Sequence, residues 1–73
     1  TDYPGKEIAM KTQYAWDQQF NSNINVVLGD EWNAGNLSYH LNSRPVWEGF
    51  VEREKLDQLK DYMCLDNVCV GSR

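Results

Sequence analysis

The sequence predicts a small α/β domain with a three-stranded parallel or mixed sheet and three helices, in the order α-β-α-β-α-β. Three segments carry apolar residues at helical spacing, and short β-branched runs lie between and after them. Helices that alternate with strands are typical of such a sheet with right-handed crossovers. The 73 residues suffice for one domain and contain no repeat. So small a core is close to zero net stability without help, which suggests a stapled domain or a fragment of a larger protein.

The first helix is predicted over residues 6–20. One apolar stripe at three- and four-residue spacing runs along it, formed by Ile8, Thr12, Ala15, Trp16 and Phe20. Trp16 continues this stripe, so we expect it in the core, facing the sheet. Residues 24–28 follow as a β-branched run bounded by Gly29, which indicates a largely buried strand.

A second helix is predicted over residues 31–41, with Asp30 as its N-cap. Its inward face would carry Ala34, Leu37, Ser38 and Leu41. Residues 44–48 indicate a second strand. We place this strand at an edge of the sheet, because Pro45 has no N–H to donate to a neighbouring strand.

The end of the chain predicts a surface helix and a last strand. Residues 52–62 are rich in charge and carry a thin apolar stripe, formed by Leu56, Leu59 and Met63. Residues 63–70 are β-prone, with the turn-forming pair Asp66-Asn67 in their middle.

Composition and charge exclude several function classes. Seven Lys and Arg residues stand against 11 Asp and Glu residues, and no basic stripe is present, which argues against binding to nucleic acid. No apolar run approaches the roughly 20 residues that a membrane helix needs. No signal peptide pattern is present either, so any addressing information is expected outside this chain.

The two cysteines, Cys64 and Cys69, leave two interpretations open. Together with His40 they supply three potential ligands, fewer than a structural zinc site needs, so no metal is expected. Their C-x4-C spacing is not the C-x-x-C of redox enzymes. They either form a local disulfide, which implies an oxidising compartment, or are two small buried hydrophobic residues. We favour the disulfide, because the turn between the two brings the sulfurs together and a small domain gains from a staple.

The segment from residue 29 to residue 39 is the candidate binding site. It follows the carboxyl end of the first strand, where open α/β sheets bind ligands. Its residue types suit sugars or other polar ligands, since rings stack on apolar faces while carboxylates and amides hold hydroxyls: Asp30, Glu31, Trp32, Asn36 and Tyr39. Arg44 could hold an anion, although a salt bridge to a nearby acid is favoured.

A purely structural interpretation of the same segment is favoured by the residues alone. In it, Asp30 caps the helix, Trp32 packs in the core, and Gly35 permits a close contact between helix and sheet. No catalytic constellation stands beside these residues. His40 has no partner at a motif spacing, and Asp30 and Glu31 do not face one another on a helix. We therefore expect no catalytic residue and no cofactor.

Four motifs, in order, carry a family resemblance. They are Tyr3-Pro4-Gly5-Lys6-Glu7-Ile8-Ala9, the following Trp16, the run from Val26 to Tyr39 with its W-x-A-G-N core, and Ser43-Arg44-Pro45. Together they resemble the C-terminal extracytoplasmic region of bacterial family 39 glycosyltransferases. Those polytopic membrane proteins are related to dolichyl-phosphate-mannose protein mannosyltransferases and to the aminoarabinose transferases of lipid A. The resemblance covers residues 3–48 and does not include the cysteine pair.

The resemblance implies that residues 1–73 form one domain of a larger membrane protein, on the periplasmic side of the inner membrane. Such enzymes move a sugar from a polyprenyl-phosphate donor to a lipid or protein acceptor. Their catalytic acids lie in the first extracytoplasmic loop, and no residue of this chain matches that motif. The expected partners are the membrane portion and a sugar, a lipid-linked sugar or an acceptor. The alternative is a free-standing periplasmic binding or protein-interaction module, and an enzyme acting by itself is the least favoured interpretation.

Overall fold

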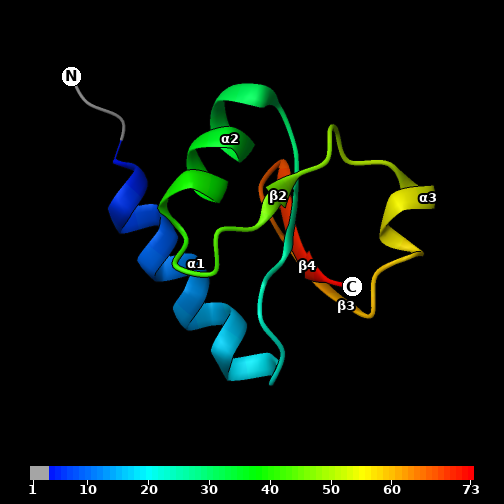
Figure 1. Cartoon of the computed structure of the whole chain (residues 1–73), viewed down its shortest axis with the longest axis horizontal. Coiled ribbons are helices and arrows are strands. Elements are labelled where there is room, and N and C mark those ends of the chain that lie inside the picture. The colour runs from blue at the N-terminus through cyan, green and yellow to red at the C-terminus, as the bar shows by residue number, and fades with distance from the viewer. Residues whose placement is uncertain (1–3) are drawn as a thin grey trace.

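The computed structural model describes residues 4–73, so Tyr3 of the first motif lies outside the described residues. Three helices and a four-stranded sheet make up the fold (Figure 1): α1 Gly5–Gln19, β1 Val26–Leu28, α2 Glu31–His40, β2 Val46–Trp47, α3 Arg53–Leu56, β3 Asp61–Leu65 and β4 Val68–Ser72. The strand order is β2-β1-β4-β3. β1 pairs with β2 in parallel and with β4 antiparallel, and β3 and β4 form an antiparallel hairpin. The expected α/β fold is thus confirmed with a mixed sheet, which has four strands where three were predicted.

The main error of the sequence prediction lies after residue 52. The helix expected over residues 52–62 is a single turn, and Asp61 already begins β3. β3 pairs along its whole length with β4, from Asp61 opposite Ser72 to Leu65 opposite Val68. The ladder hydrogen bonds of this hairpin outweigh the weak helical spacing of the segment, because the buried strand β4 must pair its backbone groups. The predicted last strand is therefore two strands around a two-residue turn.

Two helices cover one face of the sheet and the short α3 region covers the other (Figure 1). The first core joins buried side chains of α1 and α2 to one face of the strands: Ala9, Trp16, Ile24, Val27, Ala34, Leu37, Leu41, Val68 and Val70. The second joins Val26, Leu28 and Cys69 to Leu56, with Leu59 packed against them. Neighbouring strand residues thus point to opposite faces, as the two-residue period of a strand requires. Trp16 has no exposed surface, which confirms its predicted place in the core.

The edge position predicted for the strand after Pro45 is confirmed. β2 is the outermost strand beside β1, and the side chain of Val46 is 60% exposed. Trp47 is half-buried, and its indole N–H donates to the backbone oxygen of Gly29 over 2.9 Å. That bond ties the edge strand to the point where the chain leaves β1 and enters α2.

Gly29 is required at that point, whereas Gly35 is not. Gly29 has a φ of +150°, and a Cβ there would lie 3.1 Å from Val68 Cγ2 and 3.2 Å from the backbone oxygen of Asn67. A Cβ at Gly35 would meet no atom within 4 Å, so the close helix–sheet contact proposed for Gly35 does not exist. The contacts of Gly29 with Asn67 and Val68 show that the β3–β4 turn packs against it.

We expect Gly29→Ala to destabilise the fold by about 1–3 kcal/mol through backbone strain and crowding. Gly35→Ala is the matched control, and it should be neutral or stabilising by up to about 1 kcal/mol, because alanine favours a helix interior. Urea unfolding followed by circular dichroism measures both. Equal stability of the two variants would show that the turn does not depend on Gly29.

Candidate functional site

Asp30 is the N-cap of α2, and both of its carboxylate oxygens accept hydrogen bonds in this role. Its Oδ2 accepts a hydrogen bond from the backbone N–H of Asn33 and its Oδ1 accepts one from the Asn33 side-chain amide, both over 3.0 Å. These bonds, the backbone one above all, lower the pKa of Asp30 below its ordinary 3.8. The capping prediction is confirmed, and the carboxylate remains charged at neutral pH.

The lowered pKa of Asp30 predicts a pH-dependent stability. A carboxylate whose pKa is lower in the folded state stabilises the fold above its unfolded pKa and loses this effect as the pH falls through the folded pKa. We therefore expect Asp30→Ala to lower the melting temperature at pH 7, and the difference from the unchanged chain to shrink below about pH 4. Glu31→Ala, one residue on, should have a smaller effect. If the difference in melting temperature between Asp30→Ala and the unchanged chain stays constant from pH 7 to pH 2, the charge of Asp30 does not stabilise the fold.

Trp32, Asn36 and Tyr39 form what we call the outer face of α2. Their spacing of four and three residues places them on one side of the helix, opposite the buried Ala34 and Leu37. Trp32 and Tyr39 are each 64% exposed, so the expectation that Trp32 packs in the core is wrong. Seven residues of helix separate the two rings by about 10 Å along the axis. The helix therefore presents two large rings to its surroundings.

Arg44 joins this face from the loop after α2. Its guanidinium carbon lies 5.0 Å from the centre of the Tyr39 ring, within cation–π distance. His40 meets the same ring edge-on, with centroids 5.1 Å apart. Among residues 4–73 Arg44 forms no ion pair, so the salt bridge favoured for it from the sequence is absent. The positive charge of Arg44 lies instead beside the exposed ring of Tyr39.

Asn36 and Glu31 are the remaining residues that the sequence predicted for ligand binding. The Asn36 side-chain amide donates to the backbone oxygen of Trp32 over 2.7 Å, which leaves its carbonyl oxygen to accept a hydrogen bond. Glu31 is exposed at the first turn of α2. The structure thus brings Trp32, Asn36, Tyr39 and Arg44 to one surface, while Asp30 faces the helix N-terminus.

Two exposed residues of α1 were not predicted from the sequence. Met10 and Tyr14 are 66% and 69% exposed. They line a hollow of about 500 Å³ between α1 and the end of α2, together with His40 and Asn42. The signal was present in the sequence, because both residues stand at a spacing of four outside the core stripe of the helix. α1 therefore also exposes large apolar side chains, beside the end of α2.

The disulfide expected from the sequence is present. Cys64 and Cys69 lie opposite one another on β3 and β4, and their sulfurs are 2.04 Å apart. Cys64 lies at the surface and Cys69 in the second core. No group of three metal-ligating side chains occurs within residues 4–73. None of the helices in this part of the chain has the length and apolar character that crossing a membrane takes.

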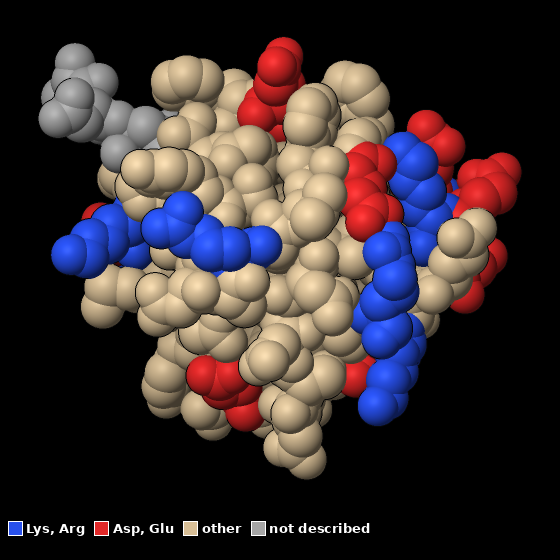
Figure 2. Space-filling model, viewed as in Figure 1, with Lys and Arg blue, Asp and Glu red and all other residues tan. Residues whose placement is uncertain are grey.

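The charged residues form no continuous basic stripe on the face seen in Figure 2. Lys and Arg side chains gather in two separate groups at its two sides, and Asp and Glu side chains lie among and between them. This arrangement is unlike the basic surfaces that follow a nucleic-acid backbone. Comparisons with protein-family models, with curated proteins and with solved structures found no match to this chain.

Proposed function

We propose that this chain is the extracytoplasmic domain of a membrane glycosyltransferase similar to family 39. The parent protein would transfer a sugar from a polyprenyl-phosphate donor to a lipid or protein acceptor. The domain itself supplies no catalytic residue. It contacts the membrane portion of the parent, or the acceptor, through the outer face of α2 and Arg44.

The observation that carries this proposal is the exposure of Trp32 and Tyr39 within the motif that resembles the family. Trp16, in contrast, is fully buried. The run from Val26 to Tyr39 thus contains the fully buried Ala34 and two rings that are largely exposed, Trp32 and Tyr39. Clustered exposed apolar residues mark interaction sites, and Trp, Tyr and Arg are the types that dominate binding energy there.

The disulfide supports the proposed location. Disulfides form and persist in oxidising environments, among them the bacterial periplasm, and are rare in the cytosol. The bond closes a loop at the tip of the β3–β4 hairpin. A periplasmic domain would gain from it, because a small core leaves little stability to spare.

Asp30 is unsuited to be a general acid, which supports the non-catalytic role. Both of its oxygens accept hydrogen bonds from Asn33, and its pKa is lowered. A general acid must hold a proton near the working pH, so its pKa must be raised and not lowered. Glu31, the first residue of α2, is exposed.

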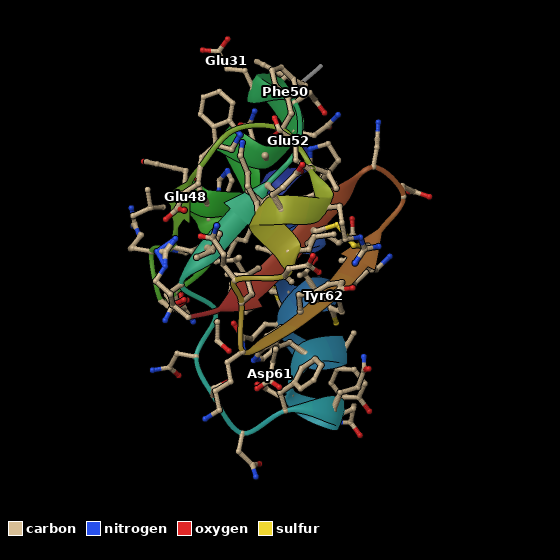
Figure 3. All side chains as sticks on the ribbon, turned by 90° about the vertical axis from the view of Figure 1, so that its right-hand side faces the viewer. Glu31, Glu48, Phe50, Glu52, Asp61 and Tyr62 are labelled. Carbon is tan, nitrogen blue, oxygen red and sulfur yellow. A yellow bond between two sulfur atoms is a disulfide. The ribbon has the colours of Figure 1, made fainter. Side chains whose placement is uncertain are left out.

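The test is a transfer assay on the full-length protein that contains this chain. The variant Trp32→Ala/Tyr39→Ala removes both rings of the outer face. Tyr62→Ala is the matched control, since Tyr62 is an exposed aromatic residue on the α3 side of the sheet (Figure 3). We expect the double variant to lower the transfer rate about tenfold or more, as the loss of two interface rings does. The control should keep most of the activity.

Protein stability is measured beside activity. Because both rings are exposed, the double variant should change the free energy of unfolding by no more than about 1 kcal/mol. If activity is unchanged, or falls only in proportion to the loss of folded protein, the outer face of α2 has no role in transfer. Activity that survives deletion of the whole domain would also contradict the proposal.

A further inference from the structure

A second hollow lies on the other side of α1, and we call it the hairpin pocket. It has a volume of about 420 Å³ and lies between α1, α2 and the β3–β4 turn. All four residues that the disulfide encloses line it: Leu65, Asp66, Asn67 and Val68. Its volume is in the range of roughly 300–1,000 Å³ that small-molecule sites occupy. Asn33 and Leu37 of the candidate segment belong to its lining, whereas the residues of the outer face of α2 do not.

The wall formed by the turn is fixed from two sides. The Cys64–Cys69 bond closes the hairpin directly before and after the four lining residues. On the far side the turn packs on Gly29, where the position of a Cβ lies 3.1 Å from Val68 and 3.2 Å from Asn67. A binding wall that is ordered in advance costs a ligand less free energy to fix. The disulfide therefore has a role in shaping the pocket as well as in stabilising the hairpin.

Branched aliphatic side chains form much of the lining of the pocket, beside the polar Thr12 and Asn33. Leu37 and Val68 form buried parts of its lining, and Ile8 and Leu65 are more exposed. Within residues 4–73, none of the side chains that line it is aromatic. Rings are the usual partners of a stacked sugar, whereas branched aliphatic side chains pack against a hydrocarbon chain. The interior thus suits an alkyl chain.

The rim of the pocket is polar and of mixed charge. Lys11, Asp66 and Asn67 are exposed there and offer both donors and acceptors. Lys11 lies 3.6 Å from Glu7, so an opposite charge already accompanies its ammonium group. Inside, the Thr12 hydroxyl donates to the backbone oxygen of Ile8 over 2.8 Å, and its oxygen can still accept a hydrogen bond. Such a rim suits several neutral hydroxyl groups better than one strong charge.

We propose that the hairpin pocket binds an amphipathic glycoside, with the alkyl chain against Leu37, Leu65 and Val68 and the sugar hydroxyls at the rim. The assignment of this ligand class deepens the proposed function and rests on it, since the acceptor there is a lipid or a protein and the pocket favours the lipid. The pocket would hold the sugar-bearing end of that lipid.

The test is a titration of the 73-residue chain with n-octyl β-D-glucoside, kept below the concentration at which it forms micelles. Methyl and amide NMR signals report the site. Two further probes separate the parts of the ligand: D-glucose has the head group alone, and tetraethylene glycol monooctyl ether has the chain without a sugar. We expect saturable shifts of Ile8, Leu37 and Leu65, with a Kd of about 1 mM or tighter for octyl glucoside. Each of the other two probes should bind at least about fivefold more weakly.

A matched pair of variants locates the binding. Leu65 and Val51 are both 39% exposed, and Val51 lies outside the pocket. Leu65→Ser should weaken binding of octyl glucoside about fivefold or more, and Val51→Ser should leave it unchanged. Both variants should keep the dispersed spectrum of the folded chain. Asn67→Ala, at the rim, should weaken the binding of octyl glucoside and leave the weak binding of the ether unchanged.

Three results would overturn the inference. They are the absence of saturable shifts, equal affinity for the ether, and shifts confined to the outer face of α2. The outcome is separable from that of the transfer assay, because binding by the chain needs no membrane portion. Octyl glucoside binding with unchanged transfer in the Trp32→Ala/Tyr39→Ala variant would remove the proposed function alone. Reduced transfer without octyl glucoside binding would remove the hairpin pocket alone.

Discussion

Replacing Trp16 by alanine is expected to remove a large part of the chain's free energy of unfolding. The indole is fully buried, and its N–H donates to the backbone oxygen of Ser22. The centroid of its ring lies 4.3 Å from the centroid of the Phe20 ring. Removing a buried Trp costs about 3–5 kcal/mol. At roughly 0.05–0.15 kcal/mol per residue, a chain of this length has a total stability of about 4–11 kcal/mol. Loss of the cooperative urea transition, or a large shift of it to lower urea, would show the effect.

Trp32→Ala is the matched control for that experiment. It makes the same chemical change at a residue that is 64% exposed. We expect a change in the free energy of unfolding of no more than about 0.5 kcal/mol. A well-dispersed NMR spectrum and an unchanged urea midpoint for Trp16→Ala would refute the central position of this side chain.

The second large effect is expected from removal of the disulfide. Replacing both Cys64 and Cys69 by alanine opens a short loop, for which the chain-entropy relation gives about 2 kcal/mol. In a domain of this size, that corresponds to a fall of about 8–16 °C in melting temperature. Thermal unfolding followed by circular dichroism measures it. The variant should also lose affinity for octyl glucoside, because the four enclosed residues form a wall of the hairpin pocket.

The unchanged chain under reducing conditions is the control for the double cysteine variant. Its melting temperature should fall to nearly the same value. Thiol titration of the denatured, unreduced chain provides an independent check. Two free thiols per molecule would contradict the disulfide, and an unchanged melting temperature on reduction would show that it contributes nothing to stability.

The long helices and the buried strand were predictable because their patterns are local. The stripe through Trp16 placed α1 within one residue at each end, and Asp30 marked the start of α2. The hairpin was not predictable in the same way. Leu56, Leu59 and Met63 fit a helical spacing, and β3 is favoured only by the backbone partners that β4 supplies.

The candidate site was predictable in its residue types and only partly in its geometry. Trp32 has the size and apolar character of a core residue, but it lies opposite the buried Ala34 and Leu37 on α2, so helical spacing was the better guide to its exposure. The hairpin pocket was beyond sequence patterns altogether. Its walls come from residues near positions 8–12, 33–37 and 65–68, which meet through the pairing of β1 with β4 and the close contact at Gly29.

We propose that this chain is part of an integral membrane protein and faces the periplasm. The most direct measurement is an immunoblot against the chain, after cell fractionation, with protease added to intact spheroplasts. We expect a large polypeptide that stays in the membrane after alkaline extraction and loses the epitope to the external protease. A small polypeptide in the soluble periplasmic fraction would contradict it and would instead identify a free-standing periplasmic module.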